Sequence, residues 1–343
     1  MKEKIIYVAP HLSSFVMEDI TILNEDYVVV PNILNWSNKK IVPILFFKQA
    51  FFLLKRINTY EIVVISFGGY WSLIPVILGK VFKKKTYIIL NGTDCCALPS
   101  LNYGNLRKPI LRFITKYSYT YATRLLPVSE SLVYTKNNYC TEFKDEVFQG
   151  YKAFLKDIST PYTVIPNAID SNFWKISNYN ERSQMTFTTV FSERQFLLKG
   201  GDLIVELAKR HPNWTFNIVG TNDVWAINLT NVKFLGYIDR TKLLEVYNNS
   251  KYYLQLSVFE GFGCSLCEAI LSGCIPIGSN VNAIPEIINN EDFILKRRNI
   301  EDLEIVIDKI QNYKLNSDFR QHILDSYNLI KRKEMLISMF RLD

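Results

Sequence analysis

Short apolar runs alternate with amphipathic segments along nearly the whole chain. Strands are predicted at residues 4–9, 61–66, 85–90, 124–128, 185–191, 215–219, 232–235, 251–256 and 274–277. Helices are predicted at residues 72–82, 107–122, 201–210, 239–248 and 265–271. Regular alternation of this kind predicts an α/β fold with parallel sheets that carry helices on both faces.

The pattern begins again after residue 170, and 343 residues are enough for two such units. We therefore expect two doubly wound domains, at residues 1–162 and 163–325. A C-terminal helix at residues 326–343 is expected to pack back on the first domain. Ligands of open parallel sheets bind beyond the carboxyl ends of the strands, so a cleft between two such domains would suit group transfer between two bound substrates.

The longest apolar stretch, residues 62–79, approaches the length of a membrane span. Gly68, Gly69 and Pro75 interrupt it, which favours a strand, a loop and a helix instead. No secretory signal is visible, and the six cysteines are too few and too irregularly spaced for a disulfide framework. These features together predict a cytoplasmic protein.

Charge is distributed unevenly between the two halves. Residues 1–160 contain 20 Lys and Arg against 12 Asp and Glu, whereas the remainder contains 20 against 21. Two stretches of the basic half, residues 46–56 and 107–124, are also aromatic. They are either ordinary amphipathic helices or a surface that docks on an anionic membrane at its inner face, and both interpretations stay open. No nucleic-acid-binding motif is found, so no nucleic-acid partner is expected.

The strongest chemical signal is a glycine-rich turn between a predicted strand and a predicted helix. Glu260 ends the strand, and the turn that follows it contains Gly261, Phe262, Gly263, Cys264 and Ser265. The glycines allow a ligand to approach the backbone, and the helix N-terminus favours a diphosphate. Glu268 lies eight residues after Glu260, so both carboxylates can accept hydrogen bonds from the hydroxyls of one ligand.

This segment resembles the E-x7-E motif of retaining glycosyltransferases of the GT-B fold, family 4. The motifs at residues 273–276 and 284–288 continue that pattern, residues 164–170 resemble its interdomain proline–asparagine motif, and residues 199–202 resemble its phosphate-binding lysine segment. The resemblance covers residues 160–290 well and the N-terminal half only in outline. It implies the GT-B fold, with two Rossmann-like domains that face a cleft.

The resemblance also implies roles for individual residues. Glu260 would orient the donor sugar, Glu268 would hold the ribose hydroxyls, and Lys199 would neutralise the leaving phosphate. An arginine is expected a few residues before the lysine, and Arg194 is the candidate, although the spacing is one residue short. The backbone of residues 261–265 would bind the diphosphate, and we assign Gly236 and Asn167 to the donor side as well.

The N-terminal half departs from the family's pattern, so its roles are less closely specified. Residues 10–15 stand in place of a glycine-rich loop, and Asn282 and Ala283 stand in place of paired glycines before the last motif. Asp94 is expected to be either a turn or helix-cap residue or a catalytic group, and His11, Asn91 and Gly69 are assigned to the acceptor side.

The predicted function is metal-independent transfer of a hexose from a UDP- or GDP-linked sugar to a glycan or lipid-linked acceptor, in cell-surface polysaccharide synthesis. No cofactor is expected beyond the nucleotide sugar. No Asp-x-Asp motif is present, and Cys264 and Cys267 lack the second pair of ligands that a metal site needs. The alternatives are a nucleotide-sugar epimerase of the same fold and a degenerate carbohydrate-binding protein.

Overall fold

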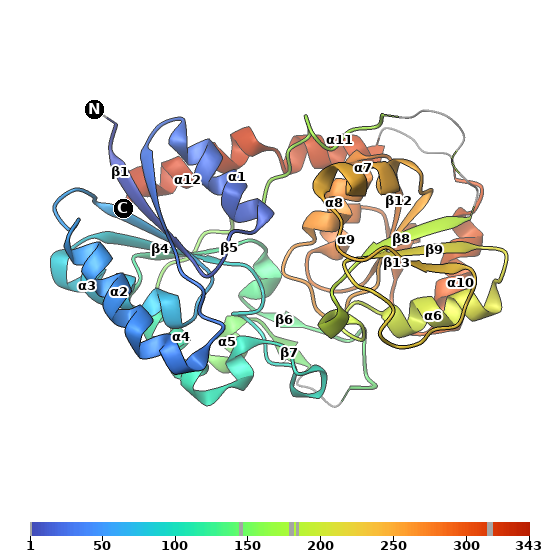
Figure 1. The fold of residues 1–343 in the computed structure, drawn as a ribbon, viewed down its shortest axis with the longest axis horizontal. Helices are drawn as coiled ribbons and strands as arrows, with labels where there is room; N and C mark the ends of the chain where they lie inside the picture. The colour runs from blue at the N-terminus through green and yellow to red at the C-terminus, as the bar shows by residue number, and fades with distance from the viewer. Residues whose placement is uncertain (1, 144–146, 178–181, 183–184, 314–317) are drawn as a thin grey trace. The chain divides into compact units, whose positions relative to one another are not determined.

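The computed structural model describes residues 2–143, 147–177, 182, 185–313 and 318–343 (Figure 1). The contacts divide the chain into two units. Unit 1 comprises Met1–Lys136, Asp145–Ala168 and Leu329–Asp343, and unit 2 comprises Asn137–Lys144 and Ile169–Asn328. The main division at residue 168 lies six residues beyond the expected boundary at residue 162.

Unit 1 is built on a five-stranded parallel sheet. The strand order is β2 (Val28–Ile33), β1 (Lys4–Ala9), β3 (Ile62–Ser66), β4 (Lys85–Leu90) and β5 (Arg124–Pro127). The strands β1, β3 and β4 are almost wholly buried, because helices cover both faces of the sheet.

One face of this sheet carries α1 (Ser14–Asn24) and α12 (Leu329–Leu342), which pack against each other. The other face carries α2 (Val42–Leu54), α3 (Tyr70–Phe82) and α4 (Pro109–Tyr121), with α3 between the other two (Figure 1). Unit 1 also contains the short helix α5 (Tyr151–Phe154) and an antiparallel pair, β6 (Thr135–Lys136) and β7 (Phe148–Gln149). The apolar stretch at residues 62–79 is thus a strand, a loop and a helix, and none of the described helices is long and apolar enough to span a bilayer.

The C-terminal helix α12 is held on unit 1 by a buried ion pair. Arg332 donates to both carboxylate oxygens of Asp19, at 2.5 and 2.9 Å, and both side chains are almost fully buried. The same guanidinium donates to the carbonyl oxygens of Ile165 and Pro166, at 3.0 and 2.6 Å. Tyr7 on β1 donates to Asp19 at 2.8 Å, so the last helix, the first helix and the first strand share one polar network.

Unit 2 is built on a six-stranded parallel sheet. The strand order is β10 (Val232–Phe234), β9 (Thr215–Val219), β8 (Thr186–Val190), β11 (Tyr252–Gln255), β12 (Ile275–Ser279) and β13 (Ile294–Leu295). The helices of this unit are α6 (Gly201–Arg210), α7 (Arg240–Asn248), α8 (Cys264–Leu271), α9 (Ile284–Ile288), α10 (Ile300–Ile310) and α11 (Asp318–Ser326). Helix α6 packs against α10, and α11 packs against α8 and α9.

Most predicted elements lie within a few residues of their observed bounds, and β1, β4, β9 and α6 match them at both ends. The last predicted strand, at residues 274–277, is not the last strand of the sheet. The two-residue strand β13 pairs with β12 and forms the edge of the sheet, and so short a strand leaves no periodic signal in the sequence. The elements α1 and β2 were not predicted, and β2 is only half-buried and contains a proline.

Candidate functional site

The sheet of unit 2 has its topological switch point between β8 and β11. The chain proceeds from β8 outwards through β9 and β10, and then crosses to β11 on the other side of β8. Ligands of open α/β sheets bind beyond the carboxyl ends of the strands at such a point. Lys199 lies in the segment that follows β8, and Glu260 lies in the segment that follows β11.

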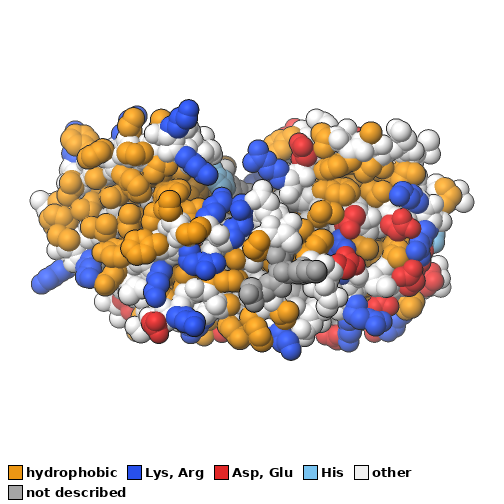
Figure 2. Space-filling model, turned by 90° about the horizontal axis from the view of Figure 1, so that it is seen from below, with side chains coloured by type: hydrophobic (Ala, Val, Ile, Leu, Met, Phe, Trp, Pro, Cys, Tyr) orange, Lys and Arg blue, Asp and Glu red, His pale blue; other side chains and the backbone are white. Residues whose placement is uncertain are grey.

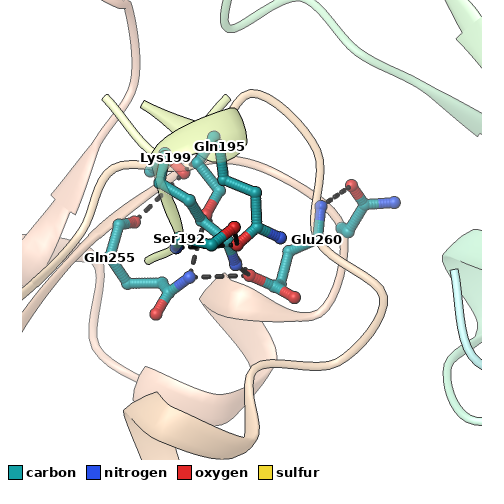
Figure 3. Close-up of polar contacts among 8 residues, drawn as sticks. Ser192, Gln195, Lys199, Gln255 and Glu260 are labelled. Carbon is teal, nitrogen blue, oxygen red and sulfur yellow. Dashed lines mark hydrogen bonds and ion pairs between the residues drawn. The ribbon is translucent and has the colours of Figure 1, made fainter. Parts of the chain in front are cut away.

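Lys199 and Glu260 form an ion pair at this switch point (Figure 3). The lysine ammonium donates to Oε2 of Glu260, and each side chain is only 15% exposed. Gln255 donates to the same oxygen at 2.6 Å, and Ser257 donates at 3.3 Å. Every contact that the described residues make with this carboxylate therefore uses Oε2, and Oε1 faces no protein donor among them.

A backbone hydrogen bond joins the two segments beside the ion pair of Lys199 and Glu260. The amide of Val258 donates to the carbonyl of Leu198 at 2.8 Å. Gly200 has a φ of +73°, and a Cβ at this position would lie 2.7 Å from backbone and side-chain atoms of Leu256. Glycine is therefore required here for close approach of the two loops, whether or not the segment also binds phosphate.

The turn after Glu260 leads into α8. Gly263 adopts a φ of +115° and caps the helix, so the chain reverses between the carboxylate and the N-terminal amides of α8. The amide of Glu260 donates to Oδ1 of Asn282 at 3.0 Å. Asn282 itself has a φ of +50°, which shows why the asparagine can replace a glycine at this position while also holding Glu260 in place.

Glu268, one turn into α8, is buried. Burial raises the pKa of its carboxyl from 4.5 to about 7, and the positive charge of Arg240 opposes that rise. Among the described residues none donates a hydrogen bond to this carboxylate. A buried carboxylate without a protein donor destabilises the fold unless a ligand hydroxyl donates a hydrogen bond to it. This agrees with the predicted contact to a ribose.

The other predicted donor-side residues lie less close to the pair. Arg194 is exposed in a single 3₁₀ turn, and the described residues form no ion pair with it. Gly236 follows β10 with a φ of +65° and accepts from the amide of Gly220 at 2.8 Å. Asn167 is buried and belongs to unit 1 by its contacts. Phe262 is buried against Tyr327, with the rings edge to face.

Unit 1 has its own switch point between β1 and β3, and a pocket of about 620 Å³ lies there. The lining includes His11 after β1 and Phe67 after β3, together with Trp36 and Trp71. His11 is exposed and its ring lies 6.2 Å from that of Phe67. No Asp, Glu, Lys or Arg is among the residues that line this pocket, so its walls are aromatic and neutral.

Asp94 lies beneath this edge of the sheet and is fully buried. Its Oδ2 accepts from the amide of Gly68 and the hydroxyl of Tyr119, both at 2.8 Å, and its Oδ1 accepts from the amides of Gly92 and Asn91, at 3.0 and 3.2 Å. Burial raises the pKa of Asp94, and these hydrogen bonds oppose the rise. The geometry makes Asp94 an organiser of the turns after β3 and β4, and direct contact with a substrate stays a prediction.

Asn91 and Gly69, the other predicted acceptor-side residues, also lie at these turns. The amide nitrogen of the Asn91 side chain donates to the hydroxyl oxygen of Ser66 at 3.2 Å. Gly69 begins α3, and its backbone amide donates to the hydroxyl of Ser72 at 3.1 Å. Of this group only His11 lines the pocket.

Several residues at the two sites were not predicted. Gln255 and Ser257 contact Glu260, and Trp36, Phe67 and Trp71 line the pocket. Ser257 and Phe67 directly follow predicted strands, which was a weak sequence signal. No local pattern marked Gln255, Trp36 or Trp71. Cys264 and Cys267 lie on α8, and the part of the chain that the structure describes holds no group of three His, Cys, Asp or Glu side chains that could bind a metal.

Part of the chain matches a known family and known proteins in sequence. Residues 172–323 match the family model of glycosyl transferases group 1. Over 101 residues the chain is 29% identical to the serotype-specific mannosyltransferase WbdA of Escherichia coli, a match that covers 29% of this chain and 12% of WbdA. Over 158 residues it is 26% identical to the glycogen synthase of Mycobacterium tuberculosis, which covers 43% of this chain and 37% of that protein. The chain thus matches only a minor part of the length of these relatives.

Solved structures resemble the whole chain. The sucrose-phosphate synthase of Thermosynechococcus elongatus superposes with a TM-score of 0.76 at 12% identity, over 99% of both chains. The lipopolysaccharide outer core galactosyltransferase WaaB superposes with a TM-score of 0.65 at 14% identity, over 99% of this chain and 100% of WaaB. At such low identity the likeness establishes the fold, and it confirms the predicted GT-B class.

The epimerase alternative gains no support from these comparisons. The motifs that carried the resemblance fall within or next to the matched segment, and Lys199, Glu260 and Glu268 all lie inside it. The chain therefore has the GT-B fold, and its residues 172–323 match the family model of glycosyl transferases group 1.

Proposed function

We propose that this protein is a retaining glycosyltransferase that moves a hexose from a UDP- or GDP-linked donor to a glycan or lipid-linked acceptor in cell-surface polysaccharide synthesis. The observation that carries the proposal is the pairing of Lys199 with Glu260 at the switch point of unit 2, beside the N-terminus of α8. An anionic diphosphate and a hydroxyl-rich sugar require a cation and a carboxylate in such an arrangement.

Each part of the donor meets a defined part of this site. The diphosphate lies against the N-terminal amides of α8, where the helix dipole favours negative charge. Oε1 of Glu260 accepts from a hydroxyl of the donor sugar, because Oε2 is already used by Lys199, Gln255 and Ser257. Glu268 accepts from the ribose hydroxyls, and Arg194 is close enough in sequence to Lys199 to add a second cation.

Transfer breaks the bond between the anomeric carbon and the phosphate oxygen and forms a bond from that carbon to the acceptor oxygen. The acceptor attacks from the face that the phosphate leaves, so the anomeric configuration is retained, and its proton passes to the departing phosphate. The charge that grows on the phosphate is neutralised by Lys199 and by the helix amides, which are fixed before the reaction begins. Because these groups come from the protein, we propose that transfer needs no metal.

The acceptor is placed in the neutral pocket of unit 1. Aromatic rings such as those of Trp36 and Trp71 present flat apolar faces, and Asn35, Ser37 and Asn105 add polar groups at the lining. This chemistry suits an uncharged sugar at the growing end of a glycan. We further propose a cytoplasmic location at the inner face of the membrane, which a lipid-linked acceptor would require.

Incubation with a panel of nucleotide sugars tests the proposal. One donor should raise the melting temperature and be slowly hydrolysed, and a chelator should leave this hydrolysis intact. Glu260→Ala and Lys199→Ala should slow hydrolysis, whereas Lys209→Ala on the exposed side of α6 is the control and should not. Turnover at the wild-type rate in the first two variants would refute the site, and donor binding without any turnover would favour the carbohydrate-binding alternative.

A further inference from the structure

Unit 1 exposes large apolar side chains on the helices α2 and α4. On α2 the exposed residues Ile44, Phe47, Phe51 and Leu54 recur at helical spacing and form one stripe. Phe47 and Phe51 are 78% and 70% exposed. The opposite side of α2 buries Val42, Leu45 and Leu53 in unit 1, with Gln49 as the one buried polar residue, so both sides of this helix are largely apolar. A helix that is apolar all round is typical of a protein core or of a membrane environment, and the outer side of α2 is not in the core.

The helix α4 repeats this arrangement. Ile110 and Phe113 are exposed, Phe113 at 72%, and Tyr117 and Tyr121 continue the stripe towards the C-terminus of the helix. Helix α3 lies between α2 and α4 and adds the exposed Val81 and Phe82 at its own C-terminal end. We call these exposed side chains of α2, α3 and α4 the apolar face of unit 1.

Positive charge surrounds the apolar face. Figure 2 shows hydrophobic side chains gathered over unit 1, with Lys and Arg side chains among them. Residues 27–129, which contain all three helices, include 14 Lys and Arg but only two acidic residues, Glu61 and Asp94. Glu61 is paired with Lys84 at 2.7 Å, and Asp94 is buried, so neither offers a free negative charge at this surface.

The C-terminal end of α3 concentrates this charge. A pocket of about 280 Å³ is lined by Lys80, Lys83, Lys84 and Lys85 together with Tyr121 of α4. The ammonium of Lys80 lies 3.5 Å from the centre of the Tyr121 ring. Tyrosine beside lysine is typical of the level at which a bilayer changes from acyl chains to headgroups.

We propose that the apolar face of unit 1 docks on an anionic phospholipid bilayer, with Phe47, Phe51 and Phe113 among the acyl chains and the lysines at the phosphates. The proposal deepens the membrane location proposed above, but vesicle binding can be measured without sugar transfer. The positive charge around the apolar face is complementary to an anionic bilayer. Scattered apolar side chains alone would suit a protein partner equally well, whereas a face without free carboxylates and rich in lysine suits anionic lipid.

Flotation with vesicles tests the proposal. The full chain should bind vesicles of phosphatidylcholine and phosphatidylglycerol at low salt, and should bind vesicles of phosphatidylcholine alone much more weakly. Phe47→Ser combined with Phe51→Ser and Phe113→Ser should reduce binding by about tenfold or more, because these side chains lose most of their apolar area. Ile305→Ser is the matched control, since Ile305 is an exposed apolar side chain on α10 of unit 2.

A second set of variants tests the electrostatic contribution to vesicle binding. Lys48→Glu combined with Lys116→Glu should weaken binding at low salt and abolish most of its salt dependence, whereas Lys233→Glu, an exposed lysine on β10, should leave both unchanged. Binding to neutral vesicles as strong as to anionic ones would overturn the proposal.

Loss of binding in the Ile305→Ser control would also overturn it. The proposal would also be overturned if the wild type formed a dimer and did not bind vesicles, and if the Phe variants were monomers. The apolar face would then bind a second copy of the chain. Nucleotide binding should persist in every variant. Vesicle binding together with absent donor turnover would therefore reject the proposed function and keep this inference.

Discussion

Replacing Glu268 with Gln removes a carboxyl group that folding transfers from water into the core of unit 2. In the folded protein burial raises the pKa of this group from 4.5 to about 7, against the influence of Arg240. At about 1.36 kcal/mol per pH unit, the difference of about 2.5 units corresponds to about 3 kcal/mol. This is the free energy by which the ionised carboxyl destabilises the empty site.

The sign of the pH dependence follows from the raised pKa. Below pH 4.5 the carboxyl is protonated in the folded and unfolded chains alike, and its contribution to stability is fully present. As the pH rises towards about 7, the unfolded chain releases this proton while the folded chain keeps it, so the free energy of unfolding falls. Above pH about 7 this decrease in the free energy of unfolding is complete. The Gln variant does not show the decrease, because it has no carboxyl to ionise.

Urea unfolding across this pH range measures the effect. The difference in unfolding free energy between Glu268→Gln and the wild type should change by about 3 kcal/mol in favour of the variant from about pH 4.5 to above about 7. Glu286→Gln is the control, because Glu286 is exposed on the neighbouring helix α9, and its curve should run parallel to the wild type. A constant difference between Glu268→Gln and the wild type would refute the reasoning.

The same carboxyl should couple donor binding to pH. Ribose hydroxyls donate to the ionised form, so the affinity of the wild type for a nucleoside diphosphate should rise as the pH increases through about 7. The Gln variant should bind more weakly and with little pH dependence in a calorimetric titration. Equal affinity of the two proteins above pH 7 would mean that Glu268 does not contact the nucleotide.

The remaining expectations concern four other positions. Lys199→Met should lower kcat by about 10²–10³-fold, as for other groups that meet developing charge, and steady-state hydrolysis of the donor would show it. His11→Ala should raise the KM for the acceptor and leave donor hydrolysis unchanged, and an unchanged KM in steady-state kinetics would mean that His11 does not contact the acceptor. Asp94→Asn should lower the free energy of unfolding by about 2 kcal/mol or more, because buried N–H donors lose their acceptors, and urea unfolding tests this. Arg332→Met should destabilise unit 1 by about 3–5 kcal/mol by leaving Asp19 buried and unpaired, and a loss below about 1 kcal/mol would contradict the role of that pair.

Local patterns in the sequence were sufficient for the two α/β units and for the glycine turn that leads into α8. Strands such as β1 and β4 are continuous apolar runs bounded by polar residues, and the periodicity of α6 is strong, so their bounds depend little on the rest of the fold. The spacing from Glu260 to Glu268 across a glycine turn is likewise a local property.

Tertiary structure alone decided the strand order and with it the switch points. Lys199 and Glu260 meet because β8 and β11 are neighbours, although 61 positions separate the two residues. The contact of Asn282 with the amide of Glu260 and the ion pair of Arg332 with Asp19 depend on the same long-range packing. No local pattern encodes such pairings.

Exposure of the apolar face was the other property that only the structure revealed. For residues 46–56 the sequence left open an ordinary amphipathic helix and a docking surface. Both sides of α2 are largely apolar, so its sequence cannot tell which side the rest of unit 1 covers. Packing against α3 assigns Leu45 and Leu53 to the interior and leaves Phe47 and Phe51 outside. Burial depends on neighbours that are distant in the sequence, so the chain specifies its elements locally and its surfaces only once it has folded.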